Sequence, residues 1–253
     1  MQHLTSRVGR AIHDWQMIKP GDQIAVGLSG GKDSSLLLYL LARLQRSAPV
    51  DFSLIGLHID MGWNMDTAPL EKLCRDLGIK LVVEKTLIGP IVFHYRKEKN
   101  PCSLCANMRR GALCTTARRL GISKVALAHH LDDAIETLLL NMFYTGSIRS
   151  FLPVTYLDRT EVTVIRPLVY LPEKMIADAA AALNLPALPS PCPHSGSSRR
   201  QDIKEFIAIL EEKIPRIRRN LLAALQHVEI DELWTDPPTR KNGQRPRPEG
   251  YPG

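Results

Sequence analysis

Hydrophobic and polar positions follow two periods along the first two thirds of the chain. Short apolar runs predict strands at residues 23–28, 53–59, 80–84, 124–128 and 162–166. Apolar positions near the 3.6-residue period predict helices at residues 3–17, 33–46, 67–77, 104–120 and 131–144. Because strands alternate with helices, we expect an α/β fold with a doubly wound parallel sheet. Ligands of such sheets bind beyond the carboxyl ends of the strands.

The pattern becomes almost entirely helical from Leu171 onward, with helices expected at 172–184, 198–212 and 214–227. Prolines 186, 189, 191 and 193 predict an extended linker around Cys192. We therefore expect a sheet domain at residues 1–170 that includes the N-terminal helix, followed by a helical extension at 171–234. The last residues, 235–253, are rich in Pro, Gly and Arg and are expected to be disordered.

The first predicted strand ends in a glycine turn, Ser-Gly-Gly-Lys-Asp-Ser, before a helix begins. Glycines leave the backbone open to an anion, and the N–H groups and dipole of the following helix favour negative charge. The lysine adds a positive charge and the serines add hydroxyl donors. We expect a phosphate or pyrophosphate site made by Ser29, Gly30, Gly31, Lys32, Asp33 and Ser34.

This turn is not a Walker A loop, because Val26 replaces its first glycine and Asp33 replaces the residue after the lysine. The hexapeptide instead resembles the PP-loop of the N-type ATP pyrophosphatases. That resemblance implies an enzyme that uses ATP to adenylate a substrate oxygen and releases pyrophosphate. The alternative is a plain glycine turn, and the match of the whole hexapeptide in its strand–turn–helix context argues against it.

Acidic residues follow two other predicted strands. Asp60 ends the second strand, where it can face a nucleotide or Mg²⁺ or can simply close a turn. His129 and His130 end the fourth strand, and Asp132 and Asp133 open the next helix. Helix capping could explain one of these carboxylates, whereas the pair beside two histidines suggests a nucleotide or Mg²⁺ site.

Three of the five cysteines form a third candidate element. Cys102 and Cys105 lie three residues apart before an arginine-rich helix, which lowers thiol pKa values, and Cys192 lies alone in the proline-rich linker. Three thiolates with an open position suit a 4Fe–4S cluster with one exposed iron. The competing interpretations are Zn²⁺ held by these thiols with His194, or cysteines that carry a persulfide.

Composition places the chain among ordinary globular proteins, with 44% hydrophobic and 23% charged residues. No run approaches the roughly 18 apolar residues of a membrane span, and charged residues interrupt the N-terminal segment, so it does not read as a secretory signal. A cytoplasmic protein without membrane contact is expected. Its cysteines should stay reduced, and Cys74 and Cys114, inside apolar helix patterns, are expected in the core.

The net charge of +7 suggests a polyanionic partner, although solvated helix faces could also explain it. Basic residues concentrate late and are rarely interleaved with aromatic residues, so phosphate contact is a better expectation than base stacking. They are Arg199, Arg200, Lys204, Lys213, Arg216, Arg218, Arg219, Arg240, Lys241, Arg245 and Arg247.

Together these motifs resemble the tRNA-cytidine 2-sulfurtransferase family, which thiolates a cytidine of tRNA. The shared stretches are Ser29–Ser34, Leu57–Asp60, Pro101–Cys105 with Arg109–Gly111, His129–Asp133, Glu136–Tyr144, Ile165–Leu168 and Pro191–Cys192. The resemblance implies that residues 29–34 hold ATP phosphates, that Asp33 and Asp60 contact Mg²⁺ or the nucleotide, and that Asp132 and Asp133 lie near ATP.

The resemblance also implies a reaction on RNA. Cys102, Cys105 and Cys192 would match the ligands of a 4Fe–4S cluster and, with Asp33, act in catalysis. A base oxygen would be adenylated, and sulfur from sulfide or a cysteine desulfurase would displace AMP. The chain departs from the family where Cys192-Pro-His194 replaces a second Cys-x-x-Cys, which leaves the substrate base open.

Three alternatives remain at this point. A lysidine-synthetase-like ligase also activates a tRNA base but does not need the three cysteines. A PP-loop thiolase could act on another tRNA base or on a small molecule. A nucleotide- or iron–sulfur-binding RNA module without catalysis would not need the acidic pairs. Helices at both ends offer surfaces for a homodimer.

Overall fold

The computed structural model describes residues 1–96, 101–189, 192 and 199–233. The predictions made for His194, for Pro191 and Pro193, and for the tail at 235–253 lie outside these residues.

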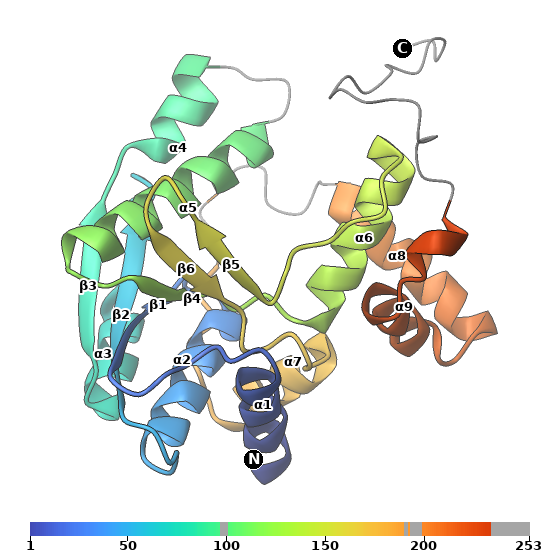
Figure 1. The fold of residues 1–253 in the computed structure, drawn as a ribbon. Coiled ribbons are helices and arrows are strands. Elements are labelled where there is room, and N and C mark those ends of the chain that lie inside the picture. The colour runs from blue at the N-terminus through green and yellow to red at the C-terminus, as the bar shows by residue number, and fades with distance from the viewer. Residues whose placement is uncertain (97–100, 190–191, 193–198, 234–253) are drawn as a thin grey trace.

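Within the described residues, six strands form one sheet in the order β3-β2-β1-β4-β6-β5 (Figure 1). All neighbouring strands are parallel except β5, which pairs antiparallel with β6. The predicted α/β sheet is confirmed, with an antiparallel strand at one edge. The strands are β1 (Asp22–Gly27), β2 (Phe52–Asp60), β3 (Lys80–Lys85), β4 (Lys124–Ala126), β5 (Val154–Leu157) and β6 (Val162–Ile165).

Helices cover both faces of this sheet, as a doubly wound fold requires. They are α1 (Gln2–Asp14), α2 (Lys32–Gln45), α3 (Ala68–Leu77), α4 (Ile88–Pro90), α5 (Pro101–Arg119), α6 (Leu131–Thr145), α7 (Glu173–Ala182), α8 (Arg199–Lys213) and α9 (Ile217–Gln226). A π-helix, η1 (Ile91–Arg96), and a 3₁₀ turn, η2 (Ile230–Glu232), complete the described elements.

Alternate residues of the central strand β1 enter two separate hydrophobic cores. Ile24 and Val26 pack with α1, α2, α3 and α7 on one face, whereas Ala25 packs with α5 on the other. This period of two is the reason that both faces of the sheet are apolar. Helix α7 lies beyond the predicted boundary at residue 170, yet Ile176 and Ala179 belong to the first of these cores.

A third, smaller core joins the helical extension to the sheet domain. Leu131, Ile135 and Leu139 of α6 pack with Ile203 and Ile207 of α8, and α9 lies against both helices (Figure 1). Because α6 begins directly after β4, this core holds α8 and α9 next to the carboxyl edge of the sheet.

Three local features differ from the sequence expectations. The edge strand β5 was not predicted, because its alternation covers only four residues before the turn to β6. The helix α4 and π-helix η1 before Pro101 were also missed. Helix α5 begins at Pro101, earlier than predicted, so Cys102 and Cys105 lie in its first turns. Proline favours this because it has no N–H to leave unpaired at the first helical position.

No helix among the described residues is both long enough and apolar enough to cross a membrane.

Candidate phosphate and thiol site

The glycine turn after β1 is braced by its own serines. Gly31 N–H donates to Ser29 Oγ at 3.3 Å, Ser29 N–H donates to Ser34 Oγ at 3.2 Å, and Ser34 Oγ donates to the Gly31 carbonyl at 2.9 Å. Gly30 has φ of +89°, and a Cβ there would lie 3.1 Å from Met65 Cε. The backbone conformation therefore favours glycine, and a side chain there would also require Met65 to shift. Gly31 caps α2, so the helix dipole points its positive end at the turn.

The linker after α7 is hydrogen-bonded to this turn. Leu188 N–H donates to the Gly30 carbonyl at 2.8 Å, and Ser35 Oγ donates to the Pro186 carbonyl at 2.9 Å. The chain reaches Cys192 only four residues after Leu188. The chain at Pro186 and Leu188, shortly before the third predicted thiol, is thus hydrogen-bonded to the predicted phosphate turn and to the helix that follows it.

Lys32 lies between two carboxylates at the start of α2. Its Nζ is 3.1 Å from Asp33 Oδ1 and 3.4 Å from Glu173 Oε1. Burial acts to lower the pKa of Lys32, but Asp33 and Glu173 outweigh it and the pKa is raised. Asp33 Oδ1 is buried and accepts no hydrogen bond of regular geometry from the described residues. Such an atom can accept from a ligand or bind a cation.

Asp133 acts in a capping box at the start of α6. His130 N–H donates to Asp133 Oδ2 at 3.0 Å, and Asp133 N–H donates to His130 Nδ1 at 3.4 Å. The other oxygen, Oδ1, accepts from Arg200 of α8 at 2.9 Å. Arg200 also donates to Glu136, whose side chain is 1% exposed. Burial raises the pKa of Glu136, while Arg200 and Lys204 oppose the rise.

Asp132 is buried and ties α7 and α9 together. Its Oδ2 accepts from the Glu173 N–H at 2.6 Å, and its Oδ1 accepts from Arg218 of α9. Lys204 of α8 donates to Glu173 Oε2 at 2.9 Å. Glu173 therefore joins Lys32 of the phosphate turn to Lys204 of the helical extension.

His129 and Asp60, two further predicted nucleotide contacts, lie at the same carboxyl edge. Asp60 Oδ1 accepts from Gly62 N–H at 2.9 Å and closes a turn. The His129 ring packs on Phe151 with centroids 5.2 Å apart, and its buried Nδ1 has no hydrogen-bond partner among the described residues. Burial, only partly opposed by Asp133, lowers the pKa of His129 to about 4. A neutral imidazole with a vacant nitrogen can hydrogen-bond a ligand.

The three predicted thiols lie within electrostatic reach of one another. Cys102 is exposed, whereas Cys105 and Cys192 are partly buried. Burial raises the pKa of Cys105, Arg109 lowers it, and negative charge on Cys192 and Cys102 raises it further. The described residues contain no group of three His, Cys, Asp or Glu side chains already arranged to hold a metal ion. By its chemistry the donor set, three soft thiols with Arg109 near Cys105, nevertheless fits a thiolate-bound iron–sulfur cluster.

The other two cysteines behave as predicted, since Cys74 and Cys114 are buried in the hydrophobic cores.

The sequence reasoning missed two residues of this region. Glu173 carries no motif, because a glutamate at the start of a helix reads as a complement to the helix dipole. Arg166 is buried and donates to the Leu152 carbonyl at 2.6 Å and Thr155 Oγ1 at 3.0 Å. Burial, with repulsion from Arg110, lowers the pKa of Arg166 to about 10. The position of Arg166 in the Ile165–Leu168 stretch was the sequence signal that could have pointed to it.

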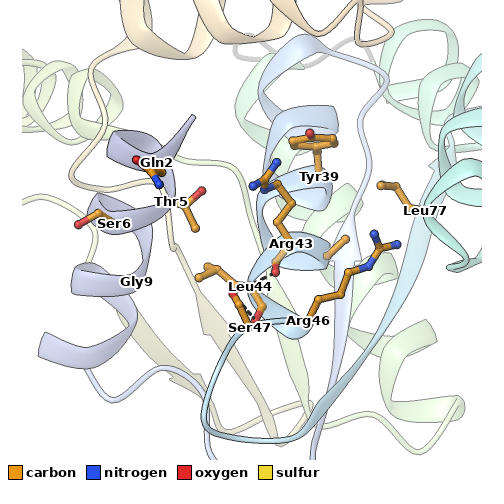
Figure 2. Close-up of a pocket in the computed structure, with 11 residues that line it drawn as sticks. Gln2, Thr5, Ser6, Gly9, Tyr39, Arg43, Leu44, Arg46, Ser47 and Leu77 are labelled. Carbon is orange, nitrogen blue, oxygen red and sulfur yellow. Dashed lines mark hydrogen bonds between the residues drawn. The ribbon is translucent and has the colours of Figure 1, made fainter.

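Two cavities lie beside α2. One of about 560 Å³ is lined by Lys32 together with Ala177 and Ala180 of α7. The other, of about 720 Å³, lies toward the opposite end of α2 and is lined by Thr5 of α1 and by Tyr39 and Arg43 of α2 (Figure 2). The smaller cavity adjoins the phosphate turn, so it is the one relevant to this site.

The parallel sheet, with the glycine turn at the carboxyl end of β1, is typical of ATP-binding PP-loop proteins. The family model of the PP-loop domain matches residues 2–190. Two similar proteins are tRNA-cytidine(32) 2-sulfurtransferases. The protein from Citrifermentans bemidjiense is 40% identical over 242 residues, covering 94% of this chain and 95% of its own. That from Pelobacter propionicus is 43% identical over 231 residues, covering 90% and 86%. The chain therefore belongs to the tRNA-cytidine(32) 2-sulfurtransferase family.

A solved structure supports the same fold. The U34-tRNA thiolase NcsA from Methanococcus maripaludis, with its 4Fe–4S cluster, aligns with a TM-score of 0.73 at 24% identity. The match covers 90% of this chain and 79% of that one.

Proposed function

We propose that the protein is an ATP-dependent tRNA sulfurtransferase that converts a cytidine of tRNA to 2-thiocytidine in the cytoplasm. The observation that carries this proposal is the linker of residues 186–192. It is hydrogen-bonded to the phosphate turn and also supplies the third of three neighbouring thiols. A site for activating an oxygen and a site for handling sulfur are thereby joined in one edge of the sheet. Family membership supports the same reaction.

The activation step uses the phosphate turn. The base carbonyl oxygen attacks the α-phosphorus of ATP, the bond to the β-phosphate oxygen breaks, and pyrophosphate leaves. Amides of Gly30 and Gly31, with Lys32, would stabilise the charge on that leaving group. The buried oxygen of Asp33, with Asp60, would hold Mg²⁺, a hard cation that prefers carboxylate oxygens and phosphates. Adenylation turns a poor leaving group, an oxide, into a good one, AMP.

The second step replaces oxygen by sulfur. Sulfide adds to the activated carbon, and the carbon–oxygen bond breaks with loss of AMP. Persulfide sulfur from a cysteine desulfurase would enter the same step after a thiol reductant supplies two electrons and releases it as sulfide. Cys102, Cys105 and Cys192 would hold a 4Fe–4S cluster, which when bound supplies an open iron position for sulfur. Arg109 partly offsets the burial that raises the pKa of Cys105.

The tRNA is proposed to contact the basic helical extension of residues 171–234. Arg199, Arg216 and Arg219 of that extension are exposed, and arginines at such positions bind phosphates. The ligase alternative receives no support from the site, because attaching an amino acid does not require the converging thiols.

The test is thiolation by purified, anaerobically reconstituted protein with ATP, Mg²⁺, sulfide and unmodified tRNA. Nucleoside mass spectrometry should detect 2-thiocytidine only when ATP is present, with AMP and pyrophosphate released in equal amounts. A thiolated uridine would overturn the choice of base. Release of AMP with lysine attached to the tRNA would overturn the sulfurtransferase in favour of the ligase.

A further inference from the structure

Helices α6 and α8 lie side by side (Figure 1), and three exposed aromatic rings come from the carboxyl end of α6 and from α8. Phe143 is 53% exposed, Tyr144 is 46% exposed and Phe206 is 39% exposed. We call these three residues the aromatic surface. Other large apolar side chains of the same helices and of the loop after α6 are also exposed: Met142, Ile148 and Ile209.

The rings of the aromatic surface are held by specific contacts. Phe143 and Phe206 meet edge to face, with centroids 5.5 Å apart and an interplanar angle of 78°. The guanidinium of Arg199 lies over the Tyr144 ring, 4.6 Å from its centroid. Arg149, in the loop after α6, is exposed, and its Nε donates to Asn141 Oδ1 at 3.3 Å. The surface therefore combines three exposed aromatic rings with the guanidinium of Arg199, and Arg149 lies in the loop that follows α6.

This combination is invisible in the sequence. The basic residues of the extension have few aromatic neighbours along the chain, which argued against base stacking. The fold supplies two rings from α6, and a third ring and one arginine from α8, more than fifty positions later. The expectation of phosphate contact alone is therefore incomplete for this end of the extension.

We infer that the aromatic surface binds unpaired bases of an RNA substrate. The inference rests on the proposed function, which makes RNA the partner, and it adds where and how unpaired nucleotides are held. Stacking on aromatic rings and on arginine planes is the usual way in which proteins hold splayed bases, whereas paired RNA hides them. Arg149 and Arg199 complement the backbone phosphates.

The charges around the aromatic surface indicate where the phosphates of a bound RNA strand would lie. Asp202 and Glu205 are exposed on α8 close to Phe206, and Glu205 accepts from Gln201 at 3.1 Å. Phosphates should therefore lie at the Arg149 and Arg199 end. A second copy of this chain is the competing occupant, because Asp202 and Glu205 of one copy could pair with the arginines of the other. The oligomeric state of the variants distinguishes that occupant from RNA.

The experiment compares tRNA binding by the full-length protein and its Tyr144→Ala and Phe206→Ala variants. Tyr156→Ala is the matched control, because Tyr156 is 58% exposed on the edge strand β5. Fluorescence anisotropy at fixed salt should show roughly 10-fold weaker binding of tRNA for each surface variant. The control and Tyr144→Phe should bind as the wild type does. A fully paired RNA duplex should bind all of them equally.

Unchanged affinity of both surface variants for tRNA would overturn the inference. So would a wild-type dimer in sedimentation analysis that dissociates in these variants, because the surface would then be an interface between copies. Failure of wild-type protein to bind tRNA at all would instead refute the proposed function.

A crosslinking variant keeps the test independent of affinity. Tyr144→p-benzoylphenylalanine, irradiated with bound tRNA, should form a protein–RNA adduct at an unpaired nucleotide. An adduct at a paired stem, to a second copy or within the same chain would contradict the inference.

Discussion

Lys32 illustrates how this site is built at the scale of single residues. Its position in the glycine turn could be predicted from the sequence, because the hexapeptide fixes both the turn and the charge. Its partner Glu173 could not be predicted, since it lies 141 positions away. In the protein without nucleotide, Lys32 is therefore already neutralised by two carboxylates, and ATP phosphates must replace them.

Replacing Lys32 by alanine should weaken ATP binding by at least about tenfold, the loss of one charge-assisted contact. The iron content of the variant should not change, because Lys32 contacts none of the three thiols within the described residues. Calorimetry with ATP and iron analysis check this. Lys72→Ala, on α3 and paired only with Asp76 among the described residues, is the charge-matched control. Equal ATP affinity in Lys32→Ala would refute the phosphate turn.

His129 makes stability depend on pH. Its folded-state pKa of about 4 lies below the ordinary value of 6.5. Between these values the unfolded chain binds a proton that the folded protein does not, so stability falls as pH drops from 6.5 to 4. The loss is at most about 3 kcal/mol. Urea unfolding of wild type and His129→Gln should diverge in this window. The same pH dependence of the unfolding free energy in both proteins would contradict the conclusion that His129 is buried and neutral.

At the scale of elements, ion pairs join the helical extension to the sheet domain. Arginines of α8 and α9 form ion pairs with three carboxylates of α6: Asp132, Asp133 and Glu136. The sequence predicted the helices well, because their apolar periods are long and clear. It could not predict these pairs, so it assigned Asp132 and Asp133 to a nucleotide or Mg²⁺ site, with helix capping as the alternative for one of them. Both lie at the expected edge, and both have oxygens already engaged by neighbouring helices. Their contact with nucleotide stays a prediction.

Lys204 should influence ATP binding through Glu173, without touching the phosphate turn. In Lys204→Met, Glu173 keeps only Lys32 as an ion-pair partner within the part of the chain that the structure describes. Its negative charge near the ATP phosphates is then less compensated. ATP affinity should fall about fivefold, the effect of a partly exposed ion pair of roughly 1 kcal/mol. Adding Glu173→Gln should restore it, as a double-mutant cycle measures. Lys174→Met is the control, because Lys174 is exposed and follows Glu173 directly in α7. Independent, additive effects would exclude this connection.

At the scale of the whole molecule, the carboxyl edge of the sheet gathers segments that are remote in sequence. Parallel topology brings together the ends of β1, β2 and β4, which made the acidic and glycine motifs predictable as one site. The linker of residues 186–188, hydrogen-bonded to Gly30 and Ser35, then carries Cys192 toward the start of α5. No local pattern encodes such a long-range bond. This linker therefore links the predicted activation of oxygen to the predicted handling of sulfur.

The most direct test of this account is the iron content and absorption spectrum of anaerobically purified wild-type protein and its Cys192→Ser variant. The account predicts about four irons per wild-type chain, the composition of a 4Fe–4S cluster. Cys192→Ser should lose the cluster and its 2-thiocytidine product while still binding ATP. Cys74→Ser, in the core, should keep the cluster if it folds. One zinc and no iron after reconstitution, or full thiolation by Cys192→Ser, would contradict the account.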